Sequence, residues 1–377
     1  MNKAFVYRLY PTIEQKDLFN RTFGCCRKIW NLMLGDRIDA YNDYGITLLP
    51  TPAWYKSDKR YSYLKEVDSL ALANVQLALQ KAYKTFFGQP GSGFPKFKSK
   101  RRSKLSYTTN NQKGTVTVSD KYVRLPKAGL VRAKIHRKAP SYMTLKSATV
   151  SCDKCGRYYV SVLYEYEQDT RLVEVDPSKI LGLDYKSDGL YVDSNGNCAE
   201  MPHYYRRSQR KLKHLQKSLS RKTGSRKGEM PSNNFTKQLS KVRKCHKHTV
   251  NQRKDYLHKR SACLADSYDL IGAEDLSLKG MSSSKGLGLG KATNDNGYGM
   301  FLQMLAYKMS VRGKCFIKVD RFYPSSQLCQ CGYKNPITKD LKVRTIICPV
   351  CGRTYGRDIN AAVNIKNEAY RIYRYGE

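Results

Sequence analysis

Hydrophobic and polar residues near the N-terminus follow two different periods, which predict a strand and then helices. Residues 2–10 alternate between apolar and polar side chains, as a half-buried β-strand does. Apolar residues then recur at helical spacing to about Tyr41, and Thr12 with Gln15 three positions later is typical of a capped helix start. After a proline-containing break, a second helical pattern runs from Ser69 to Phe87. The pattern therefore predicts one strand followed by two long helices.

Between residues 105 and 166 the apolar spacing returns to a period of two. Val, Thr and Tyr are frequent there, and Gly and Pro mark turns between short segments. Short strands of this kind predict a small barrel or sandwich, which strand 2–10 is expected to join. We therefore predict a small β-barrel or sandwich formed by residues 1–10 and 91–175, with residues 11–90 as a helical insertion.

In the second half of the chain, two short apolar runs end in acidic residues. Residues 179–184 form the first run, which ends at Asp184 and is followed by a turn and another strand-like segment. Residues 269–274 form the second and end at Glu274. Asp275 follows directly, but only one of these two acids can face Asp184, because neighbouring strand residues point to opposite sides. The pattern predicts two strands that each end in a carboxylate.

The composition indicates a partner that is a polyanion. The chain has 377 residues, enough for two or three domains, and Lys plus Arg total 69 against 31 acidic residues, a formal charge of +38. No apolar run is long enough to span a membrane, and the first residues do not resemble a signal peptide. We expect a cytoplasmic protein with reduced cysteines, no membrane association and a nucleic-acid partner.

Basic residues gather in two stretches. Residues 206–260 contain 19 Lys or Arg and two acidic residues, in a pattern of two helices around a Gly-containing loop. A solvated hairpin is one interpretation, but a nucleic-acid channel is favoured, since so much like charge would otherwise repel itself. The loop around residues 91–104 mixes aromatic and basic residues, which suits a phosphate backbone with occasional base stacking. The candidate contacts here are Lys96, Lys98, Arg101, Arg102, Arg206, Arg207, Arg210 and Lys211.

Four cysteines near the C-terminus have the spacing of a zinc ribbon. The pairs Cys329–Cys331 and Cys348–Cys351 are separated by 16 residues. Four thiolates at such spacing suit a tetrahedral structural Zn²⁺ held by two facing turns. A ribbon that is metal-free or weakly loaded is the alternative.

Three other motifs have a plain structural interpretation. The adjacent Cys25 and Cys26 lie on the apolar face of a predicted helix, so we expect them to pack in a core. The segment Cys152–Cys155 has no matching second pair, so we expect it to turn a hairpin. The glycine-rich run 286–290 lacks the strand before it and the Lys-Ser/Thr after it that a phosphate loop needs, and we interpret it as a flexible connection.

The residues around the four cysteines resemble a known family. The segments Phe-Tyr-Pro-Ser-Ser-Gln at 322–327 and Gly-Arg-Asp-Ile-Asn-Ala-Ala-Val-Asn-Ile at 356–365 are similar to the C-terminus of the TnpB family. Its members are transposon-encoded, RNA-guided DNA nucleases, similar to the miniature type V CRISPR effectors. The resemblance is strong from about Lys179 onward and looser before it. One departure is the first cysteine pair, which in the family is usually Cys-x-x-Cys and here is one residue shorter.

The resemblance implies a fold and a catalytic site. The fold is α+β and multidomain, with a wedge-like N-terminal β-barrel that carries the helical insertion. Its second half is an RNase H-like (RuvC) α/β domain, residues 176–324 and 356–377, with the zinc ribbon, residues 325–355, inserted. Two Mg²⁺ ions would serve phosphodiester hydrolysis, bridged by Asp184 and completed on either side by Glu274 and Asp358. Arg357, next to Asp358, either steadies the scissile phosphate or caps local structure.

The resemblance also implies the partners of a prokaryotic, cytoplasmic protein. A guide RNA would lie in the basic channel and pair with target double-stranded DNA, while the protein reads a short flanking motif through its N-terminal barrel and helices. The polar face of helix 69–87 would touch that duplex, unless it is simply solvated. A guided DNA binder without cleavage and an unguided nuclease of the same fold are the alternatives, and the oligomeric state is left open. The candidate contacts on this helix are Asn74, Gln80, Lys81 and Lys84.

Overall fold

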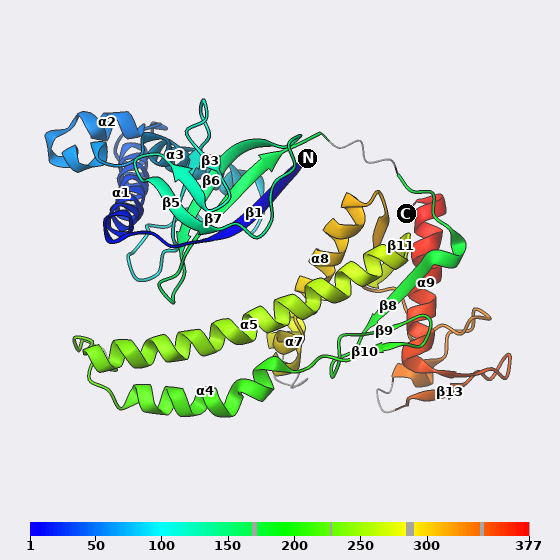
Figure 1. The fold of residues 1–377 in the computed structure, drawn as a ribbon. Helices are drawn as coiled ribbons and strands as arrows, with labels where there is room; N and C mark the ends of the chain where they lie inside the picture. The colour runs from blue at the N-terminus through cyan, green and yellow to red at the C-terminus, as the bar shows by residue number, and fades with distance from the viewer. Residues whose placement is uncertain (168–171, 227, 284–289, 340–342, 377) are drawn as a thin grey trace. The chain divides into compact units, whose positions relative to one another are not determined.

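The protein divides into two compact units, Met1–Gln168 and Asp169–Glu377 (Figure 1). The predicted boundary lies after residue 175, but the Val173 N–H donates to the Gly313 carbonyl and Val175 packs with strands of the second unit. The expected connection 286–290 lies outside the described residues except for its last glycine. The structure, a computed structural model, describes residues 1–167, 172–226, 228–283, 290–339 and 343–376.

The first unit is built on a seven-stranded antiparallel sheet in the order β2-β6-β7-β1-β5-β4-β3. The first strand lies between β7 and β5, so the N-terminus joins strands from much later in the chain, as expected. The hydrogen bonds between described residues do not close the sheet into a complete barrel, because the last strand has only two residues and pairs with β4 alone. The strands are β1 (Asn2–Leu9), β2 (Leu105–Asn110), β3 (Thr117–Val118), β4 (Tyr122–Leu125), β5 (Gly129–Lys134), β6 (Thr144–Cys152) and β7 (Tyr158–Glu165).

Helices inserted between β1 and β2 share one core with the sheet. The predicted helix start is confirmed, since the Thr12 hydroxyl accepts from the Gln15 backbone N–H and the Gln15 side chain accepts from the Thr12 N–H. Cys25 and Cys26 are buried in this core as predicted, and Cys152–Cys155 leads into the turn between β6 and β7. The helices are α1 (Ile13–Tyr44), α2 (Pro52–Ser57) and α3 (Ser69–Gly88), with a 3₁₀ segment at Lys59–Lys65.

The second unit is built on a five-stranded mixed sheet in the order β10-β9-β8-β11-β12. The strands β8, β11 and β12 are parallel, and β9 and β10 continue the sheet antiparallel from β8. The first strand of this unit, β8, is thus central, which agrees with the RNase H-like sheet that the resemblance implies. The strands are β8 (Ile180–Tyr185), β9 (Tyr191–Asp193), β10 (Cys198–Ala199), β11 (Leu270–Glu274) and β12 (Cys315–Val319).

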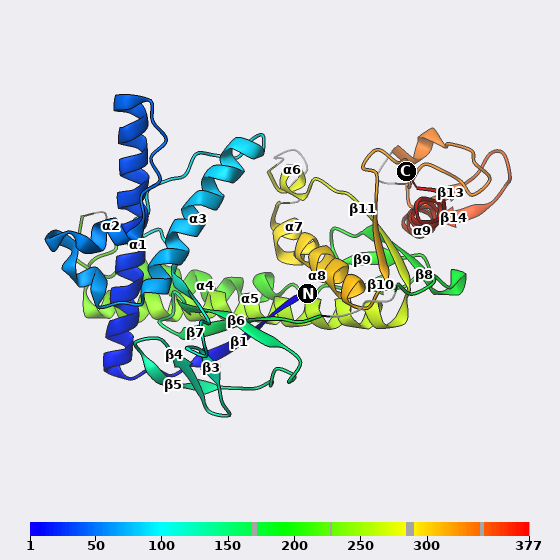
Figure 2. The ribbon, with the colours of Figure 1, turned by 90° about the horizontal axis from the view of Figure 1, so that it is seen from above.

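Helices cover both faces of this second sheet (Figure 2). Leu181 and Ile271 pack with α5 and α8 on one face, whereas Ile180 and Leu270 pack with α9 on the other. The helices α4 and α5 form a long hairpin around the predicted loop, and they lie side by side in both views. The helices are α4 (Tyr204–Ser220), α5 (Asn233–Ser267), α6 (Leu278–Ser283), α7 (Gly290–Asn296), α8 (Tyr298–Val311) and α9 (Arg357–Tyr375). None of the helices that the structure describes is long and apolar enough to cross a membrane.

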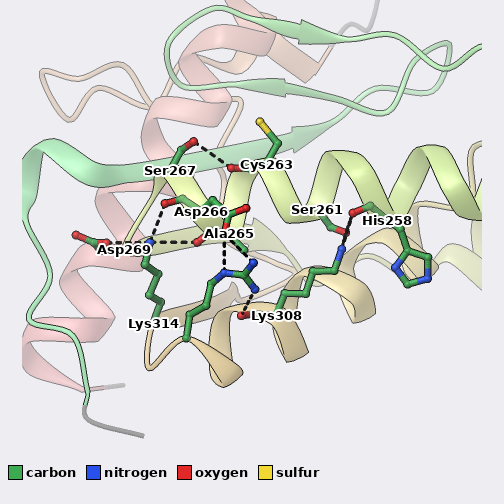
Figure 3. A network of polar contacts seen from close by, with 10 residues as sticks. His258, Ser261, Cys263, Ala265, Asp266, Ser267, Asp269, Lys308 and Lys314 are labelled. Carbon is green, nitrogen blue, oxygen red and sulfur yellow. Dashed lines mark hydrogen bonds and ion pairs between the residues drawn. The ribbon is translucent and has the colours of Figure 1, made fainter. Parts of the chain in front are cut away.

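Two lysines fasten the end of α5 to its neighbours (Figure 3). Lys308 of α8 donates from Nζ to the Ser261 hydroxyl at 2.8 Å and to the His258 carbonyl. Lys314 donates to the last carbonyls of α5 and pairs with the Asp269 carboxylate at 3.2 Å. A cation at a helix C-terminus satisfies carbonyls that have no partner within the helix. The network fixes the point where α5 passes into β11, the strand that carries Glu274.

Candidate active site and metal centre

Asp184 and Glu274 lie at the ends of two neighbouring parallel strands. The register of β8 and β11 pairs Gly182 with Gly272, and each acid follows its glycine by two residues. Adjacent strands are about 4.8 Å apart, and residues two apart point to the same face. The two carboxylates therefore lie next to each other on the face to which the glycines belong.

The glycines identify that face as the one covered by α9. A Cβ at Gly182 would lie 2.0 Å from the Ala362 carbonyl oxygen, and a Cβ at Gly272 would lie 2.5 Å from the Ala369 side chain. Real Cβ atoms do not approach other heavy atoms so closely, so these two strand positions admit only glycine at this helix spacing. The absence of side chains lets α9 lie directly on the strands.

Asp358 is in the first turn of α9, four residues before the alanine that contacts Gly182. Four helical residues advance about 6 Å, and the two strand residues from Gly182 to Asp184 advance about 6.6 Å. Since α9 runs back along β8, Asp358 comes level with Asp184. Three carboxylates from distant parts of the sequence thus face one region at the ends of the parallel strands.

Electrostatics link the three carboxylates. Burial raises the pKa of Asp184 well above its ordinary value, and the charges of Glu274 and Asp358 raise that pKa further, while Arg357 acts in the opposite direction. Burial also raises the pKa of Glu274, and the hydrogen bond that the Ser325 hydroxyl donates to Glu274 Oε1 partly offsets it. Carboxylates that oppose one another's ionisation suit a divalent cation, and oxygen ligands are those that Mg²⁺ prefers.

The carboxylate oxygens are not gathered as closely as ligands in a closed metal cage. Among the described residues, only the four ribbon cysteines bring ligating atoms together in such a set. This spacing is compatible with Mg²⁺, which keeps several of its water molecules and binds proteins through few carboxylates.

Asp275, the competing acid, is turned away from the site. Its carboxylate pairs with Lys318 at 3.0 Å and with Arg321 at 3.0 Å, and these cations hold the pKa of Asp275 below its usual value. The alternation of strand residues places Glu274 on the opposite side, as the sequence predicts for one of the two acids.

Arg344 is a residue of the site that sequence reasoning missed. Its Nη1 lies 3.1 and 3.2 Å from the two carboxylate oxygens of Asp358, and its carbonyl accepts from the Arg357 N–H. The contact arises because β13 (Thr345–Ile347) pairs with β14 (Thr354–Gly356), just before α9. Only the register of this hairpin brings Arg344 to Asp358, and no sequence motif signals it. Arg357, the predicted arginine, is near enough to affect the pKa of Asp184.

Tyr298, at the start of α8, is a second residue that the sequence did not reveal. It is fully buried, and among the described residues its hydroxyl has no hydrogen-bond partner. Burial raises the pKa of Tyr298 well above its ordinary value, and the nearby charges of Asp184 and Glu274 raise it further. The tyrosine therefore presents an unused donor close to the two strand carboxylates.

The four ribbon cysteines form a cluster that fits zinc. Their sulfur atoms lie within 4.8 Å of one another, with Cys329 Sγ 3.6 Å from Cys351 Sγ and Cys331 Sγ 3.7 Å from Cys348 Sγ. Four sulfurs placed about 2.3 Å from a central Zn²⁺ in a tetrahedron are about 3.8 Å apart. The shortened Cys-x-Cys turn thus still presents both thiols. Within the cluster, a backbone hydrogen bond from Cys351 lowers the pKa of Cys348, whereas burial raises the pKa of Cys329. Zinc binding would release the remaining thiol protons, because the metal binds the thiolate.

The predicted nucleic-acid contacts are mostly on the surface. On α4, the four predicted basic residues are all exposed, and on α3 the side chains of Gln80, Lys81 and Lys84 are exposed as well. In the loop before β2, Lys96, Arg101 and Arg102 are exposed. These side chains are accessible to a polyanion, and their contacts with nucleic acid stay a prediction. The exposed residues on α4 are Arg206, Arg207, Arg210 and Lys211.

Two predicted contacts are instead engaged within the first unit. The Asn74 amide donates to the Leu70 carbonyl of its own helix at 2.9 Å. Lys98 lies over the Trp30 ring, 3.5 Å from its centroid, and burial lowers the Lys98 pKa. Both side chains are half-buried, and their contacts with nucleic acid stay a prediction.

Three family descriptions match parts of the chain. "Cas12f1-like, TNB domain" matches residues 298–365, "Probable transposase" matches residues 161–285, and "Helix-turn-helix domain" matches residues 1–45. In the structure, residues 1–45 form β1 and α1, a strand and one helix.

Full-length relatives decide the family. A protein of Streptomyces pristinaespiralis, provisionally named an RNA-guided DNA endonuclease, is 33% identical over 380 residues, covering 97% of this chain and 89% of its own. The chain belongs to the TnpB family. InsQ of Escherichia coli (strain K12) carries the same provisional name and is 29% identical to this TnpB-family chain, covering 100% of it and 94% of its own length.

A solved structure shares the fold of this TnpB-family chain. The cryo-EM structure of a Cas12f1–sgRNA–target DNA complex matches it with a TM-score of 0.57 and 13% identity, over 97% of this chain and 99% of that one. The similarity confirms a Cas12f-like fold, in which an α+β chain carries a mixed sheet and a four-cysteine cluster near its C-terminus.

Proposed function

We propose that this TnpB-family chain is an RNA-guided DNA endonuclease. A guide RNA pairs with target double-stranded DNA next to a short flanking motif, and the second unit hydrolyses the phosphodiester backbone. The observation that carries the proposal is that Asp184 and Glu274 lie on the face of the sheet that α9 covers, near Asp358 of that helix. Burial and the charges of the other two carboxylates disfavour the ionised form of Asp184. The provisional names of the relatives supply the guided character.

The chemistry follows from oxygen ligands around a phosphodiester. Two Mg²⁺ ions, when bound, would activate a water and stabilise the leaving oxygen. Asp184 would contribute to both ions, and Glu274 and Asp358 would each complete one side. Arg344, whose Nη1 contacts both carboxylate oxygens of Asp358, would exchange that carboxylate for a phosphate oxygen, since a guanidinium donates hydrogen bonds to either group. Arg357 lies beside Asp358 and would add positive charge where the phosphate enters.

The other parts of the chain would hold the nucleic acids. The exposed basic face of α4 and its neighbour α5 offers the charge that a guide RNA–DNA duplex needs. The first unit would read the flanking motif with the exposed residues of α3 and of the loop before β2. One Zn²⁺ in the ribbon would be structural, because all four positions are taken by cysteines. The protein would act in the cytoplasm.

The test begins with the RNA that co-purifies when the gene is expressed with its native flanking DNA. The proposal predicts one abundant species with a constant scaffold and a short variable end. The purified complex should then cut a plasmid that carries the matching target beside candidate flanking sequences, and Asp184→Asn should bind the target without cutting it. Heterogeneous RNA would contradict the guide, and cutting without RNA would indicate an unguided nuclease. Equal inactivity of both proteins with retained binding would indicate a guided DNA binder.

A further inference from the structure

A short loop connects the candidate site to the zinc ribbon. The loop 324–329, which we call the support loop, leads from β12 to the first ribbon cysteine. Ser325 of this loop is 5% exposed and donates its hydroxyl hydrogen bond to Glu274. At the other end of the loop, Cys329 belongs to the sulfur cluster. The same few residues therefore contact one carboxylate of the site and one ligand of the ribbon.

Two buried asparagines of α9 hold this loop. Asn364 donates from Nδ2 to the Ser325 carbonyl and to the Leu328 carbonyl, both at 2.7 Å, and Asn360 donates to the Leu328 carbonyl at 2.7 Å. The asparagines are 5% and 4% exposed. An amide nitrogen carries two hydrogens, so Asn364 uses both of them on the support loop.

The loop does not satisfy these carbonyls itself. Its internal turn uses the Pro324 carbonyl, which accepts from the N–H groups of Gln327 and Leu328. Without the two asparagines, the carbonyls of Ser325 and Leu328 would lose their donors in a buried place, which is costly. The asparagines lie four residues apart, on one side of α9, and the helix that presents them also carries Asp358.

We propose that Asn360 and Asn364 are positioning residues, which clamp the support loop to α9 so that Ser325 keeps Glu274 oriented toward Asp184 and Asp358. The inference rests on the proposed nuclease function for its catalytic meaning. One helix then sets two of the three carboxylates, Asp358 directly and Glu274 through Asn364 and Ser325. The first ribbon cysteine directly follows Leu328, so the support loop joins the ribbon to the site.

The first experiment measures hydrogen–deuterium exchange of peptides covering residues 324–329 in the full-length protein. Asn364→Ala should speed exchange there by roughly tenfold, because it removes two buried hydrogen bonds. The matched control is Asn367→Ala, the same change at an exposed position of the same helix, which should leave exchange unchanged. If Asn364→Ala does not fold, Asn360→Ala removes only one of the two donors to Leu328 and serves in its place. Equal exchange in the control and in the clamp variants overturns the proposal.

The second experiment tests positioning in the complex with guide RNA. Asn364→Ala should lower the cleavage rate and raise the half-saturating Mg²⁺ concentration severalfold, with target binding and zinc content unchanged. Because Asn364 acts through Ser325, the double variant Ser325→Ala/Asn364→Ala should cut about as slowly as the slower single variant. Additive losses, or an unchanged Mg²⁺ dependence, overturn the positioning role. If the wild-type complex never cuts although exchange shows the loop released, the nuclease proposal fails and the clamp itself stands.

Discussion

The two candidate metal sites of the second unit are assembled in opposite ways. The ribbon gathers four sulfurs from two short turns, and their mutual distances already match a tetrahedral ion. The carboxylate site takes Asp184, Glu274 and Asp358 from two strands and a helix that are far apart in the sequence. Its charges repel one another, and Asp358 is paired with Arg344. In the ribbon, two neighbouring turns supply the complete ligand set. In the carboxylate site, separate elements supply three ligands and leave the other coordination positions free.

The difference follows from what each site would have to do. A structural ion needs a complete and rigid ligand set, so the protein supplies all four positions. A catalytic ion needs open positions for water and substrate, so the protein supplies a few ligands and leaves the rest. Burial and the charges of Glu274 and Asp358 all raise the pKa of Asp184, so the ionised carboxylates oppose folding in the metal-free protein. In the ribbon the pKa shifts of the cysteines have opposite signs, lowered for Cys348 and raised for Cys329.

The largest expected effect is on cleavage. Asp184→Asn keeps the shape of the side chain and removes the charge that both Mg²⁺ ions would share. We expect the cleavage rate to fall by about a thousandfold or more, since the charge contributes several kcal/mol to the transition state. Plasmid cleavage over a range of Mg²⁺ concentrations measures this effect. Asp275→Asn is the matched control, because its carboxylate pairs with Lys318 and Arg321 and faces away from the site. Similar losses of cleavage rate in both variants would contradict the assignment of Asp184 to the catalytic site.

The next effect concerns the closed site. Cys348→Ser should abolish bound zinc and unfold the ribbon, because zinc binding supplies most of the folding free energy of such small modules, about 10–16 kcal/mol in isolated peptides. Metal analysis and thermal unfolding measure the two consequences. Cys198→Ser changes an exposed cysteine outside the ribbon and should keep the full zinc content. A wild-type protein that holds no zinc after careful purification would show that the shortened Cys329–Cys331 turn has lost its metal.

A smaller effect is the pH dependence of stability that the carboxylate site causes. The folded-state pKa values of Asp184 and Glu274 are raised, so the folded protein binds more protons than the unfolded chain from about pH 4 upward. The contribution of these groups to the free energy of unfolding therefore falls as pH rises through that window. Metal-free Asp184→Asn should melt higher than the wild type at neutral pH, by about 3 °C for each kcal/mol of relieved repulsion. The difference should shrink as the pH approaches 4.

Added Mg²⁺ provides the control for this prediction. It should raise the melting temperature of the wild type at neutral pH and have little effect on Asp184→Asn, since only the wild type keeps the shared carboxylate. A wild type that is as stable as the variant at every pH, with or without Mg²⁺, would show that the three carboxylates do not strain the folded state.

The sequence could predict whatever depends on local pattern. The capping box at Thr12, the strands that end at Asp184 and Glu274, and the four-cysteine spacing all follow from periodicity or spacing within a few residues. The contacts of Arg344 and Asn364 could not be predicted in this way. Arg344 reaches Asp358 through the register of a two-stranded hairpin, and Asn364 reaches Ser325 across 39 positions of sequence. Such contacts depend on how elements pack, which a single sequence does not encode locally.

In the first unit, too, the sequence predicts the strands but not how the whole sheet is completed. The alternation of residues predicts its strands, and β1 joins them as expected. Barrel closure requires that the first and last strands of the sheet also pair, which is a property of the whole sheet. The burial of Lys98 against Trp30 likewise depends on a loop folding onto α1, which its basic composition does not indicate.

The smallest expected effect concerns the unused hydroxyl of Tyr298. A buried hydroxyl without a partner has lost its hydration and gained no hydrogen bond, so Tyr298→Phe should leave the free energy of unfolding of the second unit unchanged or raise it slightly. Tyr7→Phe is the contrast in the first unit, because Tyr7 is equally buried and donates to the Arg137 carbonyl at 2.8 Å, so its loss should cost about 1 kcal/mol. Denaturant unfolding measures both. A large loss in Tyr298→Phe would mean that the hydroxyl already has a partner, such as an ordered water between it and Asp184. The carboxylate site would then be more nearly closed than its protein ligands indicate, and the contrast with the ribbon would narrow.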